Sequence, residues 1–336
     1  MSETWLTVVA PLSVGSWFTH FSKDLDAPLV VGEESDDPIT LADRIEDYAC
    51  GRSVRFHSGH DSLLRDWVAS RELRRRAIEV ESQSGMAVAA GIDKLLQKRL
   101  LALADIPTPA WGDVDAPGPA NTCTLRKGRN STQSRGLAWA AHQSVGATES
   151  YWETYVAGIE YSVVLYCGGI GLTVFPPVWK GRVRDDLLPP WRRLRLVPSG
   201  LTSGTELALQ RTAAAVAQLI DAWGFVEVEF ILTDDGVAVV IDVNPRICGT
   251  MRIVAMATET PIFDLSDVNR SGTRIESARR FAAEVPYSGV PFAAGGVIAT
   301  SRLTCSASSP EAVRSTLATH GYTASDSDWP GAWCAN

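Results

Sequence analysis

The sequence predicts a mixed α/β protein with more than one domain. Residues 1–90 alternate short apolar runs with helical patterns, which is typical of a small parallel sheet covered by helices. Residues 205–223 have an amphipathic helical pattern that stops at Gly224, and residues 224–249 form two β-rich runs around an Asp-Gly dipeptide. At 336 residues the chain has room for two domains or for one large domain of three lobes.

The N-terminal region contains three short apolar runs that predict strands: residues 5–12, 28–32 and 53–57. A helix is expected over residues 40–50, begun by Thr40 as its N-cap, and a charged helix over residues 65–81. His57 is expected in a loop at the surface, and the alternative is a role in contact with substrate. No G-x-G-x-x-G follows the first strand, so no dinucleotide site is predicted.

Composition excludes several classes of protein. The net charge of −8 argues against nucleic acid or an anionic membrane as a partner. The six cysteines include no C-x-x-C pair, which predicts reduced thiols rather than a zinc site or a disulfide framework. The chain contains no run of 18 apolar residues. We therefore expect a soluble protein of the cytoplasm.

The β-rich segment is predicted to be a hairpin with polar groups on one face. If Asp-Gly is the whole turn, Glu229 faces Asp242 and Glu227 faces Asn244 across the two strands. The other face is apolar and is expected in the core: Val228, Phe230, Leu232, Val239, Ile241 and Val243.

These facing carboxylates predict a metal site. Directly opposed Cβ atoms lie about 5 Å apart, and like charges at that distance are destabilising unless a cation lies between them. The oxygens of Glu229, Asp242 and Asn244 are hard ligands of the kind that Mg²⁺ takes. Arg246 adds a guanidinium fork suited to phosphate or carboxylate. The alternative is a polar face that only meets water, and for Glu227 alone that alternative is equally good.

The hairpin resembles the metal-binding end of ATP-grasp enzymes. V-E-F is followed by D-V-N-P-R, where the family usually has E-x-N-P-R, and Asp242 is one methylene shorter than the usual glutamate. Three more segments extend the resemblance over residues 90–260: D-K-L-L-Q-K-R-L-L-A-L-A-D-I-P-T-P, T-L-R-K-G-R-N-S-T-Q-S-R-G and Y-W-E-T-Y-V-A-G-I-E-Y.

The first two of these segments imply phosphate contacts. The helix that Asp93 caps carries Lys98, which the resemblance implies as a phosphate lysine, although alone Lys98 would belong to a solvated face. Lys127 is implied as the second phosphate lysine, although a glycine follows it where the family usually has proline. The loop after it contains Ser131 and Ser134, which would donate hydrogen bonds to phosphate.

The third segment resembles the hinge between the two ATP-grasp lobes. The resemblance implies that Glu153 and the backbone of Thr154, Tyr155 and Val156 face adenine, and that Glu160 binds ribose hydroxyls. Without the family, this segment would be an edge strand with a glycine kink.

Residues 179–196 are basic and are expected to form a flexible loop near the metal. Lys180, Arg182 and Arg184 are candidates for holding phosphate or a substrate carboxylate, and the alternative is a solvated loop. Arg252, beyond the hairpin, is a further candidate for contact with substrate.

The resemblance implies the ATP-grasp fold, in which two α+β lobes clamp a nucleotide. We expect an N-terminal α/β domain at residues 1–90, a small lobe at 91–155, and a large lobe at 156–336 that ends in an accessory strand–helix–strand segment.

The resemblance also implies an ATP-dependent carboxylate–amine ligase that acts through an acyl phosphate on amino acids or small peptides. Arg246, Lys127 and Lys180 would be its catalytic residues. ATP and Mg²⁺ would be required, with two ions expected and Mn²⁺ as an alternative, and a homodimer is common in the family. The alternatives are a kinase, a ligase with a non-amine acceptor, or a nucleotide-binding regulator without turnover.

Overall fold

A computed structural model of the chain describes most of its 336 residues. The described residues are 5–10, 29–30, 35–59, 62–113, 123–130, 137–140, 150–168, 171–189, 192–260, 262, 272–323 and 329–333. None of the helices in these ranges is long and apolar enough to cross a membrane.

The N-terminal region forms the predicted parallel sheet, with strand order β2-β1-β3-β4. Its strands are β1 (Trp5–Ala10), β2 (Leu29–Val30), β3 (Ser53–Ser58) and β4 (Val80–Glu81). The helices of this region are α2 (Pro38–Ala49), α3 (Leu63–Arg75) and α4 (Gly85–Ile92). Apolar residues of β1, β3, α2 and α3 share one core, which gives this region its own hydrophobic centre.

Two helix boundaries differ from the prediction. Asp37, not Thr40, caps α2, because its Oδ1 accepts hydrogen bonds from the N–H groups of Ile39 and Thr40 at 2.9 and 3.1 Å. The helix predicted to reach Glu81 ends at Arg75, and β4 takes the last two residues of that range.

His57 is buried, contrary to the prediction that it lies at the surface. Its ring stacks on Trp223 with the centroids 5.0 Å apart, and it contacts Phe225 as well. Gly224 makes room for it, since a Cβ there would lie 3.1 Å from His57 Nδ1. The preceding helix ends at Leu219, not at Gly224 as predicted. Gly224 is instead the first residue of a strand. Burial lowers the pKa of His57 to about 3, with Arg55 adding to the effect.

The largest sheet contains 11 of the described strands. Nine follow the order β14-β13-β9-β11-β12-β16-β19-β18-β17, and β10 and β15 extend it beside β9. Their bounds are β9 (Ile159–Gly168), β10 (Gly171–Val174), β11 (Val178–Arg182), β12 (Arg195–Val197), β13 (Gly224–Leu232), β14 (Ala238–Asn244), β15 (Gly272–Ile275), β16 (Phe281–Pro286), β17 (Phe292–Ala294), β18 (Val297–Ala299) and β19 (Arg302–Ala307).

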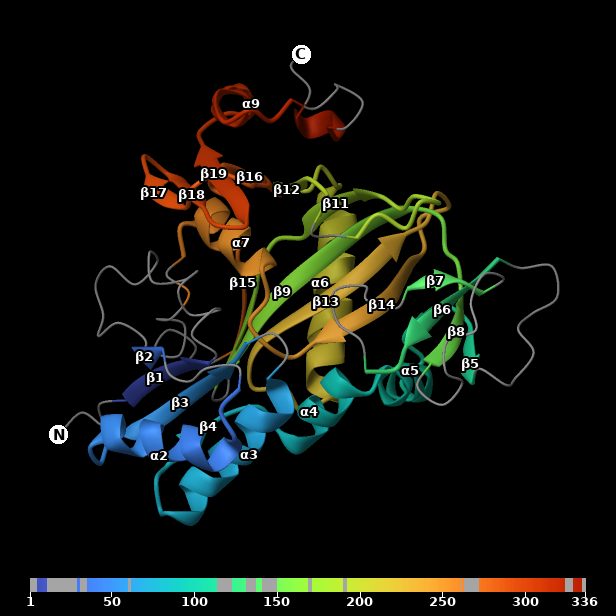
Figure 1. Ribbon diagram of the computed structural model, residues 1–336. Coiled ribbons are helices and arrows are strands. Elements are labelled where there is room, and N and C mark those ends of the chain that lie inside the picture. The colour runs from blue at the N-terminus through green and yellow to red at the C-terminus, as the bar shows by residue number, and fades with distance from the viewer. Residues whose placement is uncertain are drawn as a thin grey trace.

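Helices cover both faces of this sheet (Figure 1). Helix α6 (Ser203–Leu219) packs on one face of β9 and β13, and α7 (Thr250–Thr258) contributes to the core on the other. Helix α9 (Pro310–Thr319) packs on β16 and β19 at the C-terminal end, and a short helix, η7 (Gly331–Trp333), follows it. The expected accessory segment is thus present as strand and helix, but no strand follows α9 within the described residues.

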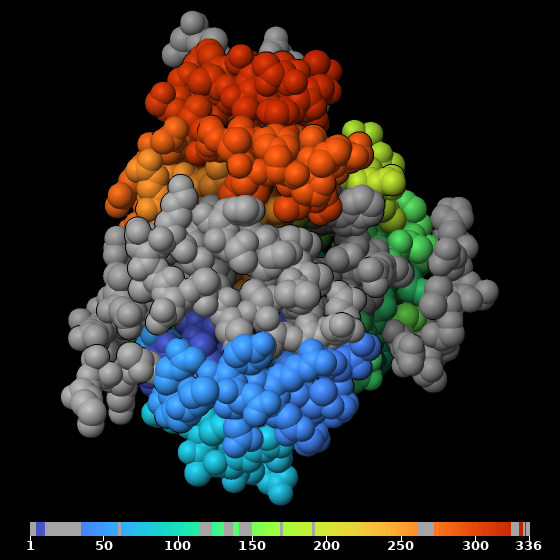
Figure 2. Space-filling model, turned by 60° about the vertical axis from the view of Figure 1, so that its left-hand side comes forward, coloured from blue at the N-terminus to red at the C-terminus, as the bar shows by residue number. Residues whose placement is uncertain are grey.

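A small antiparallel sheet of order β5-β8-β6-β7 lies beside β13 and β14 (Figure 1). Its strands are β5 (Trp111–Asp113), β6 (Thr124–Gly128), β7 (Ala138–Trp139) and β8 (Ser150–Thr154), and α5 (Lys94–Leu103) precedes them. The N-terminal region and the C-terminal segment lie at opposite ends of the molecule (Figure 2).

The β13–β14 hairpin has the predicted pairing at its polar end but not at its turn. Glu229 faces Asp242 and Glu227 faces Asn244, as predicted. The turn, however, spans residues 233–237 rather than two residues, because the Thr233 side chain bonds both the N–H and the C=O of residue 237. A β-bulge between the two ends restores the register.

The bulge changes which side chains reach the core. Val240 is fully buried against α6, where Val239 and Ile241 were predicted. Ile241 instead points to the opposite side and lines a cavity beside Asp242. The bulge therefore adds an apolar side chain to the polar face of the hairpin.

The burial of His57 generates a prediction about pH. Between pH 6.5 and about 3, the unfolded chain binds a proton at His57 that the folded protein excludes. The free energy of unfolding should therefore fall as the pH falls, by about 1.4 kcal/mol per unit through this group. Urea denaturation at pH 7 and pH 5 should show a loss that is about 2 kcal/mol smaller in His57→Phe than in the wild type. An equal loss in both proteins, with equal m-values at pH 7, would contradict the assignment.

Candidate active site

A cavity of about 110 Å³ opens between the small sheet and the β9–β13–β14 part of the large sheet. It is lined by Lys94, Pro109, Leu125, Lys127, Leu137, Glu153, Thr154, Tyr155, Val156, Glu160, Val183, Arg184, Leu187, Arg193, Glu229, Ile231, Ile241 and Asp242. Most of the residues predicted from sequence to bind nucleotide or metal thus meet at one cavity.

Glu153 joins two lysines at the base of the small lobe. Its Oε2 lies 2.8 Å from Lys98 Nζ, and its Oε1 lies 2.7 Å from Lys127 Nζ. Burial opposes ionisation of Glu153, but Lys127 and Lys98 outweigh that penalty and hold its pKa below the usual value. The Glu153 carboxylate, predicted to face adenine, is therefore committed to the two lysines.

The first lysine of α5, not the second, lines the cavity. Lys98 was predicted to contact phosphate, but it is 0% exposed, and burial lowers its pKa to about 8 although Glu153 acts in the opposite direction. Asp93 caps α5 as predicted, and Lys94, the next residue, places its Nζ 2.5 Å from Asp242 Oδ1. Lys94 is thus a site residue that the sequence prediction missed, and Lys98 positions Glu153.

The hinge between β8 and β9 presents its backbone to the cavity. The N–H groups of Thr154 and Tyr155 already donate to the carbonyls of Ala110 and Cys123, both at 2.8 Å. Of the three residues predicted to face adenine, only Val156 has an N–H group without a backbone partner among the described residues. The hinge can therefore offer one N–H donor to a base at this point.

Glu160, predicted to bind ribose, lies at the start of β9 and is paired with Arg193. Arg193 Nη1 donates to Glu160 Oε2 at 2.7 Å, while Oε1 is buried with no hydrogen-bond partner in the described structure. Gly158, just before it, is required by packing, because a Cβ there would lie 2.4 Å from the carbonyl oxygen of Leu232. Arg193 stands in a run of arginines, and its spacing from Glu160 gave no sign of this pair.

Lys180 neutralises the carboxylates of β13. Its Nζ lies 2.6 Å from Glu229 Oε1 and 3.0 Å from Glu227 Oε1, and Thr250 donates a further hydrogen bond to Glu227 at 2.6 Å. Lys180 was predicted in a flexible loop, but it is a buried residue of β11. This correction places its ammonium group between two carboxylates rather than on the surface.

The electrostatics of the carboxylates follow from their neighbours. Burial raises the pKa of Glu229, and Glu227 and Glu160 add to the effect while Lys180 opposes it. For Asp242, burial acts in the same direction, but Lys94 outweighs it and the pKa is lowered. Lysines thus supply the positive charge that the facing carboxylates require.

The donor set fits a hard divalent cation. Glu229 and Asp242 each give one oxygen to a lysine, and their second oxygens form no hydrogen bond with described residues. Asn244 Oδ1 accepts from Arg246 Nη2 at 3.1 Å. No group of three His, Cys, Asp or Glu side chains in the described part of the chain is arranged to hold a metal. A bound ion would therefore depend on these two carboxylates, the amide oxygen and ligands from the nucleotide.

Of the three other arginines predicted to contact phosphate or substrate, only Arg184 lines the cavity. Arg182 pairs with Asp234 at 2.9 Å in an exposed ion pair, away from the lining of the cavity. Arg184 does line the cavity. Arg252 is buried against Glu284. Two residues predicted in the phosphate loop, Ser131 and Ser134, lie outside the described residues.

The Glu153 bridge generates a stability prediction. Glu153→Gln would leave Lys98 and Lys127 buried without their carboxylate, which costs about 3–5 kcal/mol for a buried pair. Chemical denaturation should show this loss in the free energy of unfolding. Asp234→Asn, which removes the exposed partner of Arg182, is the matched control and should cause no measurable change. Equal effects of the two substitutions would contradict a buried structural role for Glu153.

Comparisons with known proteins identify the fold. Residues 91–250 match the family model described as the ATP-grasp domain. No curated protein matches the sequence. Among solved structures, the chain resembles the biotin carboxylase domain of 2-oxoglutarate carboxylase from Hydrogenobacter thermophilus, which holds MgADP, ADP and bicarbonate. The TM-score is 0.70 at 13% identity, with 94% of this chain and 88% of that chain covered.

Two further solved structures are similar to this chain over nearly their whole length. N5-carboxyaminoimidazole ribonucleotide synthetase from Thermotoga maritima has a TM-score of 0.66 at 15% identity, with 94% of this chain and 97% of that chain covered. The L-amino acid ligase from Bacillus licheniformis has a TM-score of 0.68 at 14% identity, with coverages of 94% and 96%. These similarities confirm the predicted ATP-grasp fold, and residues 91–250 of this chain match the ATP-grasp domain.

Proposed function

We propose that this protein is an ATP-dependent carboxylate–amine ligase that forms an amide bond on amino acid or small peptide substrates. The observation that carries the proposal is the convergence of Glu229, Asp242, Lys94 and Lys127 on the cavity that the hinge borders, where the buried Lys180 pairs with Glu229. A binding protein without turnover has no need of so many charges around the phosphate end of a nucleotide. We also propose that residues 1–90 form the N-terminal domain, residues 91–155 the small lobe and residues 156–336 the large lobe.

The cavity offers an apolar place for the base and a charged place for the phosphates. Leu125, Ile231 and Ile241 line it together with the hinge, where Val156 N–H can donate to adenine. Glu160, with one oxygen unpartnered among the described residues, is suited to accept from ribose hydroxyls. Lys94 and Lys127 line the same cavity, Lys94 beside Asp242 and Lys127 beside Glu153.

Phosphoryl transfer requires neutralisation of charge more than covalent help from the protein. Lys94 and Lys127 would bind phosphate oxygens, and Lys180 would hold Glu229 in place. Glu229, Asp242 and Asn244 would hold Mg²⁺, which when bound neutralises the phosphates of ATP. Whether one or two ions bind, and whether Mn²⁺ can substitute, are questions for metal titration.

The proposed reaction has two steps. An oxygen of the substrate carboxylate attacks the γ-phosphorus, the bond from that phosphorus to the β–γ bridging oxygen breaks, and ADP leaves. The amine then attacks the carbonyl carbon of the acyl phosphate, a C–N bond forms, the C–O bond to phosphate breaks, and the amine loses a proton. Arg246 beside Asn244 would hold the acyl phosphate during the second step.

The comparisons support an ATP-dependent enzyme more broadly than they support this reaction. The similar structures include an L-amino acid ligase, a ribonucleotide synthetase and carboxylases. An amino acid or peptide substrate is favoured here by the sequence resemblance to stand-alone carboxylate–amine ligases.

The test is ADP release from Mg-ATP in the presence of amino acids, singly and in pairs. We expect ADP only with particular pairs, with an equal yield of amide by mass spectrometry. Asp242→Asn should abolish turnover, and Asp234→Asn, the same change at the hairpin tip, should not. ADP with one substrate and a stable phosphorylated product would indicate a kinase instead. ADP with a non-amine acceptor would indicate another ligase, and nucleotide binding without ADP under every condition would favour a regulator.

A second prediction concerns Lys94. Its replacement by methionine removes a charged contact to phosphate that is worth about 1.5–3 kcal/mol, so the Kd for Mg-AMPPNP should rise about tenfold or more. Mg²⁺ alone should bind more tightly, since Asp242 loses its lysine. Calorimetry measures both quantities. Arg211→Met, on the exposed face of α6, is the control. Unchanged nucleotide affinity in Lys94→Met would show that this lysine does not meet phosphate.

A further inference from the structure

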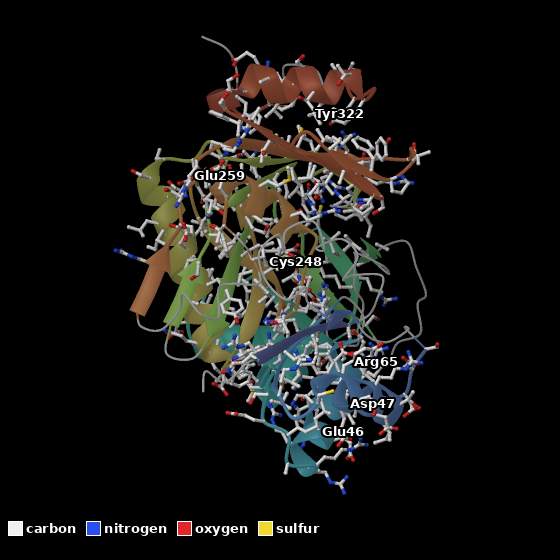
Figure 3. All side chains as sticks on the ribbon, turned by 90° about the vertical axis from the view of Figure 1, so that its left-hand side faces the viewer. Glu46, Asp47, Arg65, Cys248, Glu259 and Tyr322 are labelled. Carbon is white, nitrogen blue, oxygen red and sulfur yellow. The ribbon has the colours of Figure 1, made fainter. Side chains whose placement is uncertain are left out.

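A groove of about 470 Å³ lies on the N-terminal region, where α3 packs against α4. It is lined by Trp67, Arg71, Arg74, Arg75, Ser82, Gln83, Ser84 and Gly85. None of these residues lines the cavity of the candidate active site. Helix α3, marked by Arg65, and the C-terminal segment, marked by Tyr322, lie toward opposite ends of the molecule (Figure 3). The groove is therefore separate from the sites described above.

Three arginines of α3 bring positive charge to the groove. Arg71, Arg74 and Arg75 are spaced three and four positions apart, so they project from one side of the helix. No Asp or Glu of the described residues lines the groove. Arg75 Nη1 lies 2.8 Å from Glu72 Oε2, but neither Arg71 nor Arg74 forms an ion pair in the described part of the chain. Two positive charges at the groove thus lack a carboxylate partner.

These two arginines are held in place by uncharged groups. The Arg71 guanidinium group lies over the Trp67 ring, 5.1 Å from its centroid. Arg74 Nη2 donates to the Val80 carbonyl at 3.0 Å and to Ser82 Oγ at 2.8 Å. Burial, and then the charge of Arg71, lowers the pKa of Arg74. Arg74 Nη1 and the guanidinium N–H groups of Arg71 form no hydrogen bond with described residues, so both arginines can donate to a ligand.

The start of α4 adds backbone donors to the same groove. Gly85 and Met86 are its first two residues, and neither N–H group has a hydrogen-bond partner in the described structure. Ser84 caps the helix by accepting from the Ala87 N–H at 3.0 Å. A Cβ at position 85 would lie 3.3 Å from Trp67 Cζ2, so a side chain there would crowd the ring. The glycine thus lets the positive end of the helix dipole lie close to the arginines.

The wall of the groove is fixed by the strand behind it. Gln83 donates to the Phe225 carbonyl at 3.0 Å and accepts from the Trp223 N–H at 3.1 Å. Ser84 Oγ donates to the Ile220 carbonyl at 3.2 Å. These contacts hold residues 82–85 against the segment that leads into β13. The donors of the groove are therefore positioned in the absence of a ligand.

We propose that this groove binds the phosphate group of a small phosphorylated molecule. A phosphate monoester carries about 1.5–2 negative charges at neutral pH, which matches the two arginines without a carboxylate partner. Guanidinium forks and helix N-termini both suit phosphate oxygens. A carboxylate would neutralise only one of the two charges. The groove and the nucleotide cavity share no lining residue, so this inference does not depend on the proposed ligase function.

The test is calorimetry on protein saturated with Mg-AMPPNP, which occupies the nucleotide cavity. The protein is titrated with inorganic phosphate, methyl phosphate and acetate at constant ionic strength. We expect both phosphates to bind with a Kd of about 1 mM or lower, and acetate, which has a single charge, to bind at least about tenfold more weakly. Arg71→Gln should raise the Kd for methyl phosphate about tenfold or more, because it removes a charged hydrogen-bond donor.

Two further variants make the outcome decisive. Arg71→Lys keeps the charge but loses the planar fork, and an intermediate Kd for methyl phosphate is expected. Arg211→Gln, on the exposed side of α6, is the matched control and should bind methyl phosphate as the wild type does. All three variants should bind Mg-AMPPNP with the affinity of the wild type, since neither arginine lines the nucleotide cavity.

Four results would overturn the inference. Acetate could bind as tightly as the phosphates, or neither phosphate could bind at concentrations up to about 10 mM. Unchanged affinity in Arg71→Gln would place the bound phosphate elsewhere. Tighter binding of hexaglutamate than of methyl phosphate would assign the groove to an acidic polypeptide. Phosphate binding that depends on Arg71 in a protein that forms no amide would reject the ligase reaction and leave this site in place.

Discussion

The cost of placing like charges side by side in a buried hairpin shapes the whole site. Glu229 faces Asp242 across β13 and β14, and burial makes their mutual repulsion expensive. The protein relieves it with ammonium groups from two other elements, Lys94 at the start of α5 and Lys180 in β11. Each carboxylate thus has a counter-charge in the absence of a metal ion. The same lysines would also neutralise part of the negative charge of bound nucleotide phosphates.

The same constraint links parts of the chain that are far apart in sequence. The Lys94–Asp242 pair joins residues separated by 148 positions, and it connects the helix preceding the small sheet to the hairpin of the large one. Lys98, one turn after Lys94, holds Glu153 together with Lys127. The ion pairs that place charge at the cavity are therefore also the contacts that hold its walls together. A substitution in one of these pairs should change both the site and the free energy of unfolding.

The ends of the molecule support this centre in different ways. On the N-terminal side, Gln83 bonds the carbonyl of Phe225 and the N–H of Trp223, and His57 stacks on the same tryptophan. These contacts hold the start of β13. On the C-terminal side, the buried Glu284 of β16 pairs with Arg195 of β12, Arg252 of α7 and Arg302 of β19, and so ties three other elements together.

The sequence by itself determined the local features. The alternation of elements predicted the N-terminal parallel sheet, Asp93 predicted the start of α5, and period-two spacing placed Glu227 and Glu229 on one face. The same period would also have placed Ile231 on that face. The resemblance to ATP-grasp enzymes, carried by short motifs, predicted the fold, and most of the nucleotide- and metal-binding residues that it implied line the cavity.

Only the tertiary structure decided which charged groups meet. Lys94 and Lys98 lie on one helix face, and spacing cannot tell which of them reaches the cavity; packing against Glu153 buried Lys98. No motif predicts the β-bulge, which places Ile241 in the cavity lining although the sequence pattern predicted it in the core. The pairs Glu160–Arg193 and Glu284–Arg302 depend on long-range strand pairing. The physical reason is that ion pairs form by proximity in space, and a sequence pattern records only neighbours along a helix or a strand.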